Sequence, residues 1–234
     1  MSAKYSVSPI LPLLLVLALP WVAAPASAGW GDALKAAGDA GAKAAGLSVT
    51  PTQIEGAFRE LLSMGADSAV ESLSQDGGFS KLAATSLSLP DSYQKVAETV
   101  APDLLANLNS AAEAAVPAIG ELFQKTIKTM EFANPSGLLS GKSDAVTSYF
   151  EESARSSLAE NAAPLIQSAL EKTGAGSAVS AVQKLSTLTG TDFDPVSYLT
   201  GKTLDSMFLY MAKTEQGVRS GDIAVTSELL KKVF

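Results

Sequence analysis

The stretch that decides the fold runs from Met130 to Leu158 and reads MEFANPSGLLSGKSDAVTSYFEESARSSL. Its first half is rich in Gly, Pro and Ser, which is typical of a loop. Ser143 then stands where it can cap a helix. Apolar residues follow at helical spacing, at Val146, Phe150, Ala154 and Leu158. We therefore predict a loop that leads into an amphipathic helix ending near Glu160.

Proline and glycine mark the ends of further predicted helices on both sides. Thr50 and Gln53 have capping-box spacing with Pro51 between them, so a helix should start there and end at Gly77-Gly78. A proline removes a backbone donor, so each later one marks either a kink or a boundary. After a loop over 79–89, the expected segments are 91–100, 102–115, 117–130, 161–173, 178–188, a long helix opened by Asp194-Pro195, and 223–234.

Nowhere do apolar and polar residues alternate for long enough to predict a strand, and no repeat of fixed period occurs. The fold class is therefore all-α. We predict a single helical domain of about seven to nine helices over residues 50–234, several of them delimited or kinked by proline. Residues 29–49 are rich in Ala and Gly with few large apolar side chains, and we expect a flexible leader.

The amino terminus has the parts of a secretory signal peptide. Lys4 is followed by a leucine-rich run over 10–19, then by Pro20 and by Ala-Ser-Ala at 26–28. The apolar run is shorter than the roughly 20 residues that span a bilayer. We predict cleavage after Ala28, no permanent membrane anchor afterwards, and a periplasmic or secreted protein.

Composition narrows the chemistry. The chain has 17 Lys and Arg against 24 Asp and Glu, a net charge of −7, which argues against nucleic acid as a partner. It has no Cys and no His, so disulfides and the commonest general base and metal ligand are missing. We predict no cofactor and no metal site.

Two motifs are similar to known functional motifs, but neither is complete. Gly137 to Ser143 ends in Gly-Lys-Ser but is one residue short of a phosphate-binding loop, and no strand precedes it. Ser92, Lys95 and the Lys-Thr-Gly at 172–174 echo β-lactam-opening hydrolases, but the intervening Ser-Asp-Asn is not present. The sequence selects no catalytic residue.

Aromatic and methionine side chains concentrate on two predicted helices. Core packing is the ordinary explanation for them. The alternative is an apolar pocket between the helices, in which a tyrosine hydroxyl orients a ligand. The residues of this candidate ligand or partner surface are Tyr149, Phe150, Tyr198, Met207, Phe208 and Met211.

Several short motifs follow one another along the chain. They are Gln75-Asp76-Gly77-Gly78-Phe79, Ala115-Val116-Pro117, the segments 127–130, 132–133, 137–139, 144–150 and 204–208, and the closing Leu-Leu-Lys-Lys-Val-Phe at 229–234. Taken in this order, they resemble an exported bacterial family known as domain of unknown function 4197. The resemblance implies a secreted or periplasmic helical protein. It brings no established activity and no catalytic residues.

Our leading hypothesis is an exported helical domain, more a binding module than an enzyme, for an unknown protein partner or an apolar small molecule. Two alternatives stay open. One is a hydrolase built on carboxylates with Lys or Ser, and the other is a structural protein of envelope assembly.

Overall fold

A computed structural model describes residues 49–89, 94, 98, 101–189 and 194–234. The predicted signal peptide over 1–28, nearly all of the predicted leader, and most of the segment 91–100 lie outside the described residues.

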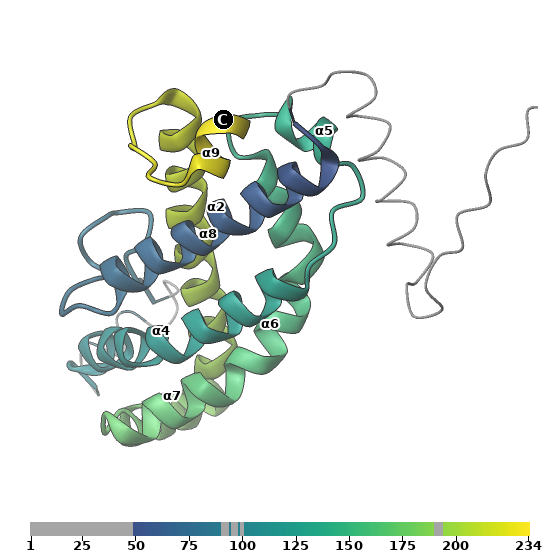
Figure 1. The fold of residues 1–234 in the computed structure, drawn as a ribbon. Coiled ribbons are helices and arrows are strands. Elements are labelled where there is room, and N and C mark those ends of the chain that lie inside the picture. The colour runs from purple at the N-terminus through teal and green to yellow at the C-terminus, as the bar shows by residue number, and fades with distance from the viewer. Residues whose placement is uncertain (1–48, 90–93, 95–97, 99–100, 190–193) are drawn as a thin grey trace, which may run out of the picture.

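The described residues form seven helices and no strand, which confirms the all-α prediction (Figure 1). The helices are α2 (Pro51–Leu73), α4 (Leu104–Thr129), α5 (Pro135–Leu139), α6 (Ala145–Lys172), α7 (Gly176–Thr189), α8 (Pro195–Ser220) and α9 (Glu228–Val233). None of the helices in this part of the chain has the length and apolar character needed to cross a membrane.

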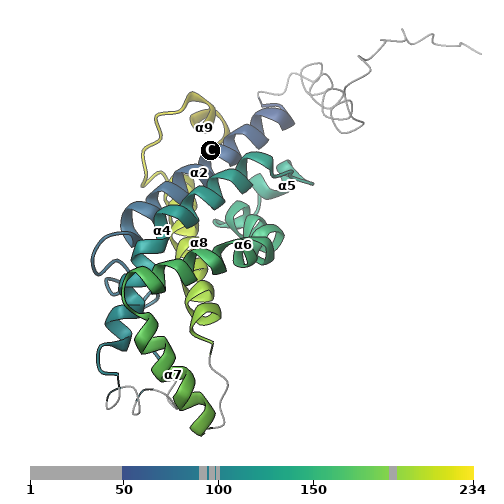
Figure 2. The same cartoon turned by 90° about the horizontal axis from the view of Figure 1, so that it is seen from below.

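Four long helices build the core, each packed on two others. α2 packs mainly on α4 and α8, and α6 packs mainly on the same two helices (Figures 1 and 2). The buried apolar side chains of the four helices belong to one core. α9 and α5 pack on α2, and α7 packs on α4. Phe123 of α4, Phe150 of α6 and Phe208 of α8 meet at the centre, with ring centroids 5.1–5.8 Å apart.

The prolines have two different roles in the structure. Pro51, Pro135 and Pro195 each stand in the first turn of a helix, where the missing N–H costs nothing. Pro117 and Pro164 lie inside α4 and α6. The segments predicted on either side of residue 117 are therefore one helix, as are those on either side of residue 161.

Helix α2 begins as its sequence predicts. The Thr50 hydroxyl accepts from the Gln53 N–H at 3.3 Å, and the Gln53 side chain accepts from the Thr50 N–H at 3.1 Å. Asp194 likewise caps α8 by accepting from the Val196 N–H at 3.0 Å. Both signals are local, because donor and acceptor lie within three residues of each other.

Four local predictions were wrong. Helix α2 ends at Leu73, before the predicted stop at Gly77-Gly78. Ser143 does not cap α6; the capping position is Asp144, whose side chain makes no capping hydrogen bond. The loop after Met130 contains the short helix α5, capped by Asn134, whose side chain accepts from the Gly137 N–H at 3.0 Å. The last helix starts at Glu228, because Ser227 caps it.

Candidate functional site

The six side chains predicted to form a ligand or partner surface fall into two groups in the structure. Phe150, Met207, Phe208 and Met211 are buried in the core formed by α2, α4, α6 and α8. Tyr149 and Tyr198 are only partly buried and lie at its edge. The four core residues therefore present no surface to a ligand, and the two tyrosines are the members to follow.

Tyr149 holds the segment that precedes α5. Its hydroxyl donates to the Glu131 carbonyl at 3.2 Å and accepts from the Ala133 N–H at 3.3 Å. Its ring stacks on Phe132, with centroids 5.8 Å apart. On the other side of that segment, Arg59 of α2 donates to the Met130 carbonyl at 2.6 Å. The hydroxyl is thus used in positioning the backbone.

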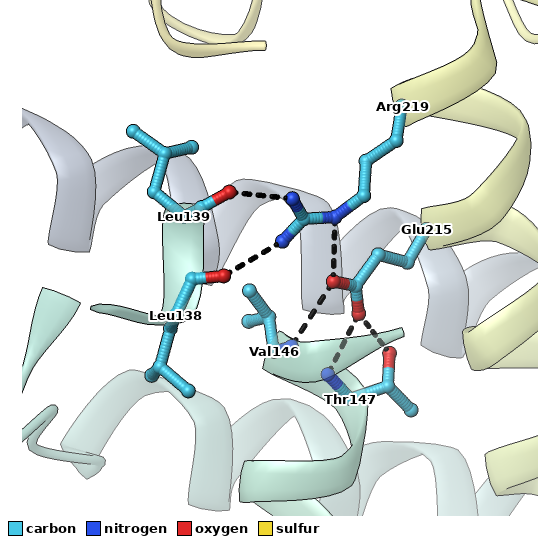
Figure 3. Close-up of polar contacts among 6 residues, drawn as sticks. All are labelled: Leu138, Leu139, Val146, Thr147, Glu215 and Arg219. Atoms are coloured by element: carbon cyan, nitrogen blue, oxygen red, sulfur yellow. Dashed lines mark hydrogen bonds and ion pairs between the residues drawn. The ribbon is translucent and has the colours of Figure 1, made fainter. Parts of the chain in front are cut away.

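A buried carboxylate on α8 takes over the capping of α6. Glu215 is completely buried and accepts from the N–H groups of Val146 and Thr147, at 3.0 and 2.7 Å, and from the Thr147 hydroxyl at 2.8 Å (Figure 3). These N–H groups are in the first turn of α6, where no intrahelical acceptor exists. Glu215 therefore does from another helix what an N-cap side chain does locally.

Arg219 completes this network and extends it to α5. Its Nε donates to Glu215 at 2.9 Å, and its two terminal nitrogens donate to the carbonyls of Leu139 and Leu138 at 2.8 and 3.1 Å (Figure 3). Its guanidinium also lies 5.0 Å from the ring centroid of Phe234. A carboxylate accepts about four hydrogen bonds, and Glu215 accepts four. Because every acceptor position of Glu215 is used, the charge of this buried carboxylate is compensated and the network stabilises the fold.

A second buried carboxylate is not fully satisfied. Glu113 of α4 is 8% exposed, and its Oε1 has no hydrogen-bond partner. Burial raises the pKa of Glu113, and Asp76 adds to the rise, while hydrogen bonding by the backbone of Gly77, Gly78 and Phe79 opposes it. Glu113 thus holds the glycine turn that follows α2, and the cost is that its carboxylate is removed from water.

The glycine turn needs glycine at both positions. Gly77 has a φ of +72°, which side-chain-bearing residues rarely adopt. A Cβ at Gly78 would lie 2.5 Å from the Leu73 carbonyl oxygen, so no side chain fits there. From the sequence, this turn is recognised only as the end of a helix. The tertiary structure adds that the buried Glu113, 35 residues later in the chain than Gly78, packs on it.

The chain leaves this turn and forms one wall of a pocket. Leu87 and Leu89 are buried, whereas Ser88 between them is exposed. Tyr198 of α8 holds Ser88 from the other side, since its hydroxyl donates to the Ser88 carbonyl and accepts from the Ser88 N–H at 3.3 Å. The second predicted tyrosine therefore positions a wall and does not contact the space behind it.

We name this space the leucine pocket. Its volume is about 180 Å³, and it is lined by Leu87, Ser88, Leu89, Gln94, Glu98, Ala101, Pro102, Leu104 and Leu105. A cavity of roughly 150 Å³ lined by aliphatic side chains is large enough for a benzene molecule. At the rim, Leu105 is 37% exposed, and it is one of two large apolar side chains with such exposure in the described part of the chain. Sequence reasoning missed this pocket because its leucines come from separate segments.

Among the described residues, no three Asp or Glu side chains lie close enough together to hold a metal ion. The structure thus defines an all-α domain in which the buried Glu113 and Glu215 hold loops in place, together with a small pocket lined largely by leucines. The chain belongs to the family described as Protein of unknown function (DUF4197), whose model matches residues 48–234. No curated protein and no solved structure matches this chain.

Proposed function

We propose that this protein is an exported, non-enzymatic binding module that takes a small apolar molecule into the leucine pocket. The observation that carries the proposal is the pocket itself, in which the buried Leu87, Leu89 and Leu104 surround a space of about 180 Å³. Ligand pockets are typically concave and apolar with a few polar groups. Among the described residues that line this pocket, the polar side chains are Ser88, Gln94 and Glu98.

The pocket is supported by groups that would keep it preformed. Tyr198 fixes Ser88 by two hydrogen bonds, and Glu113 packs on the turn from which the same segment starts. A preformed site loses less conformational freedom on binding than one that must be ordered by its ligand. These contacts favour a binding role for the pocket over an accidental packing gap.

Ligand-observed NMR with toluene as the probe tests this proposal. We expect toluene to bind the full protein and Leu105→Asp to abolish that binding, since a carboxylate at the rim makes entry of an apolar ring unfavourable. Ile223→Asp is the matched control, because Ile223 is 38% exposed and does not line the pocket. Equal binding by the two variants, or no binding by the parent, contradicts the proposal.

Export is proposed on the signal-like order of residues 1–28. Intact-mass measurement on the protein recovered from its own host should show that residues 1–28 have been removed. The same protein, measured under native conditions, should also show any small molecule that it retains. Recovery of the protein with residues 1–28 still attached would overturn the export half alone.

No observation on the described residues favours either alternative, the hydrolase or the envelope-assembly protein. A hydrolase needs at least two ionisable groups that converge in a cleft, and Glu215, the fully buried carboxylate, has all its acceptor positions occupied. An assembly surface should expose a large apolar patch. In the described residues the exposed large apolar side chains are Leu105 and Ile223.

A further inference from the structure

The segment that leads into α6 carries no buried side chain. Residues 134–144 include α5, and each of them is exposed or only partly buried. The residues on both sides differ, since Phe132 is 5% exposed and Val146 is fully buried. We name residues 134–144 the strap. Because burial of apolar side chains is the main favourable term in folding, a segment without it opens at a lower cost than the core.

Most hydrogen bonds of the strap lie within it. Asn134 accepts twice, from the Leu138 N–H at 3.1 Å and, through its side chain, from the Gly137 N–H at 3.0 Å. The Ser140 N–H donates to the Ser136 carbonyl at 3.2 Å. These bonds can persist when the strap moves as a unit, so they do not hold it against the long helices.

One side chain ties the middle of the strap to the core. In the described part of the chain, it is Arg219 that donates to the Leu138 and Leu139 carbonyls, at 3.1 and 2.8 Å (Figure 3). The side chains of Leu138 and Leu139 are themselves only partly buried against the core. Arg219 does not depend on these carbonyls, since its Nε donates to Glu215 at 2.9 Å and its guanidinium lies 5.0 Å from the ring centroid of Phe234. Loss of the two carbonyl contacts therefore leaves the buried ion pair intact.

We propose that the strap opens as one unit while the four long helices stay folded, and that Arg219 is the latch that keeps it closed. The chain stays fixed on both sides of the strap, because Tyr149 binds the Glu131 carbonyl and Glu215 binds the Val146 N–H. Opening frees the two terminal nitrogens of Arg219. A guanidinium with free parallel donors pairs well with a carboxylate or a phosphate. The open strap therefore uncovers an anion-recognising group that the closed strap covers.

Limited digestion of the full protein with trypsin tests this proposal, because Lys142 lies in the strap between α5 and α6. When opening and closing are fast relative to cleavage, the rate of the cut after Lys142 follows the population of the open state. We expect this cut without urea, at a rate that stays constant at urea concentrations too low to unfold the core. Lys142→Gln is the site control and should lose the cut.

Arg219→Lys should speed the cut about tenfold, the factor expected for the loss of one charge-assisted hydrogen bond. Lysine keeps a charge beside Glu215 but does not have the guanidinium fork that reaches two carbonyls as well. Arg59→Lys is the matched control, because Arg59 donates to the Met130 carbonyl, which lies outside the strap. This control should leave the rate unchanged, and circular dichroism shows whether the core of each variant is folded during the digestion.

A cut after Lys142 that appears only when the core unfolds overturns the proposal. An Arg219→Lys variant that is cut at the rate of the parent overturns it as well. If Arg219→Lys does not fold, Leu139→Ala decides in its place, since it removes a partly buried side chain of the strap and leaves Arg219 and Glu215 unchanged. Its cut should be roughly fivefold faster than that of the parent, and equal rates would contradict the opening of the strap.

Discussion

At the scale of single residues, two buried glutamates show opposite ways of using a carboxylate inside a helical core. Glu215 has four donors around it and a guanidinium beside it, so its charge is compensated. Glu113 keeps an unpartnered oxygen and an acidic neighbour, Asp76, so the backbone hydrogen bonds from residues 77–79 compensate its charge only in part. Removal of the Glu215 carboxylate should therefore lower the free energy of unfolding, and Glu113 should make that free energy depend on pH.

Glu215→Gln should destabilise the fold by about 3 kcal/mol, because it leaves the Arg219 charge unpaired and turns an amide N–H₂ toward N–H donors of α6. Urea unfolding measures the loss. Glu228→Gln is the control: the Glu228–Lys231 pair is exposed and should contribute less than about 1 kcal/mol. Similar losses in both variants would show that Glu215 is not the cap of α6.

Glu113→Gln should change how stability varies with pH. The folded pKa of Glu113 is raised above its ordinary value of 4.5 by burial, so the folded state binds more protons than the unfolded state just above pH 4.5. The Glu113 contribution to stability is therefore lost as pH rises through that window. The Gln variant does not titrate, so its stability relative to the parent should rise over the same window and then stay constant.

Thermal unfolding of both proteins between pH 4 and 8, values chosen to span that window, measures this difference. Glu121→Gln serves as the control on the same helix, because its side chain is exposed. A difference between Glu113→Gln and the parent that does not vary with pH would mean that Glu113 is not a strained carboxylate.

At the scale of elements, close approach between helices depends on single glycines. A Cβ at Gly65 of α2 would lie 3.0 Å from the Met211 Cα of α8, which belongs to the backbone and cannot move aside easily. A Cβ at Gly201 of α8 would meet nothing within 4 Å. The same substitution should therefore have opposite effects at the two sites.

Gly65→Ala should destabilise the protein by about 1–3 kcal/mol through overpacking, although alanine favours helix. Gly201→Ala should stabilise it by up to about 1 kcal/mol, because only the helix propensity changes. Urea midpoints of the two variants provide the comparison. A stabilised Gly65→Ala variant would rule out the tight crossing of α2 and α8.

At the scale of the whole molecule, the four long helices share one core, and the segment between α4 and α6 is held by side chains from three of them. Arg59 of α2, Tyr149 of α6 and Arg219 of α8 all bind its backbone carbonyls. A helix can hardly leave this arrangement without breaking contacts in the others. Such coupling favours one cooperative unfolding transition.

Far-UV and near-UV circular dichroism should therefore report the same urea midpoint for the full protein. The first follows helix content, and the second follows aromatic packing such as that of Phe123, Phe150 and Phe208. Loss of the near-UV signal at a clearly lower urea concentration would reveal a stage in which the helices persist without the shared core.

The sequence by itself determined the helical class, the starts of α2 and α8 and the stop of α6, because those signals lie within a few residues of each other. Thr50 with Gln53, Asp194 with Pro195, and Gly174, whose φ is +75°, all act locally. The family resemblance also came from the sequence, since ordered short motifs do not depend on folding.

Only the tertiary structure decided which groups act together across the chain. The cap of α6 is Glu215, about 70 residues away from Val146, and the stretch from Met130 to Leu158 owes its conformation to Arg59 and Arg219 on other helices. The leucine pocket likewise brings residues 87–89, which Tyr198 of α8 holds, beside the start of α4. Burial and capping by distant residues leave no periodic signal, so a local pattern could not predict them.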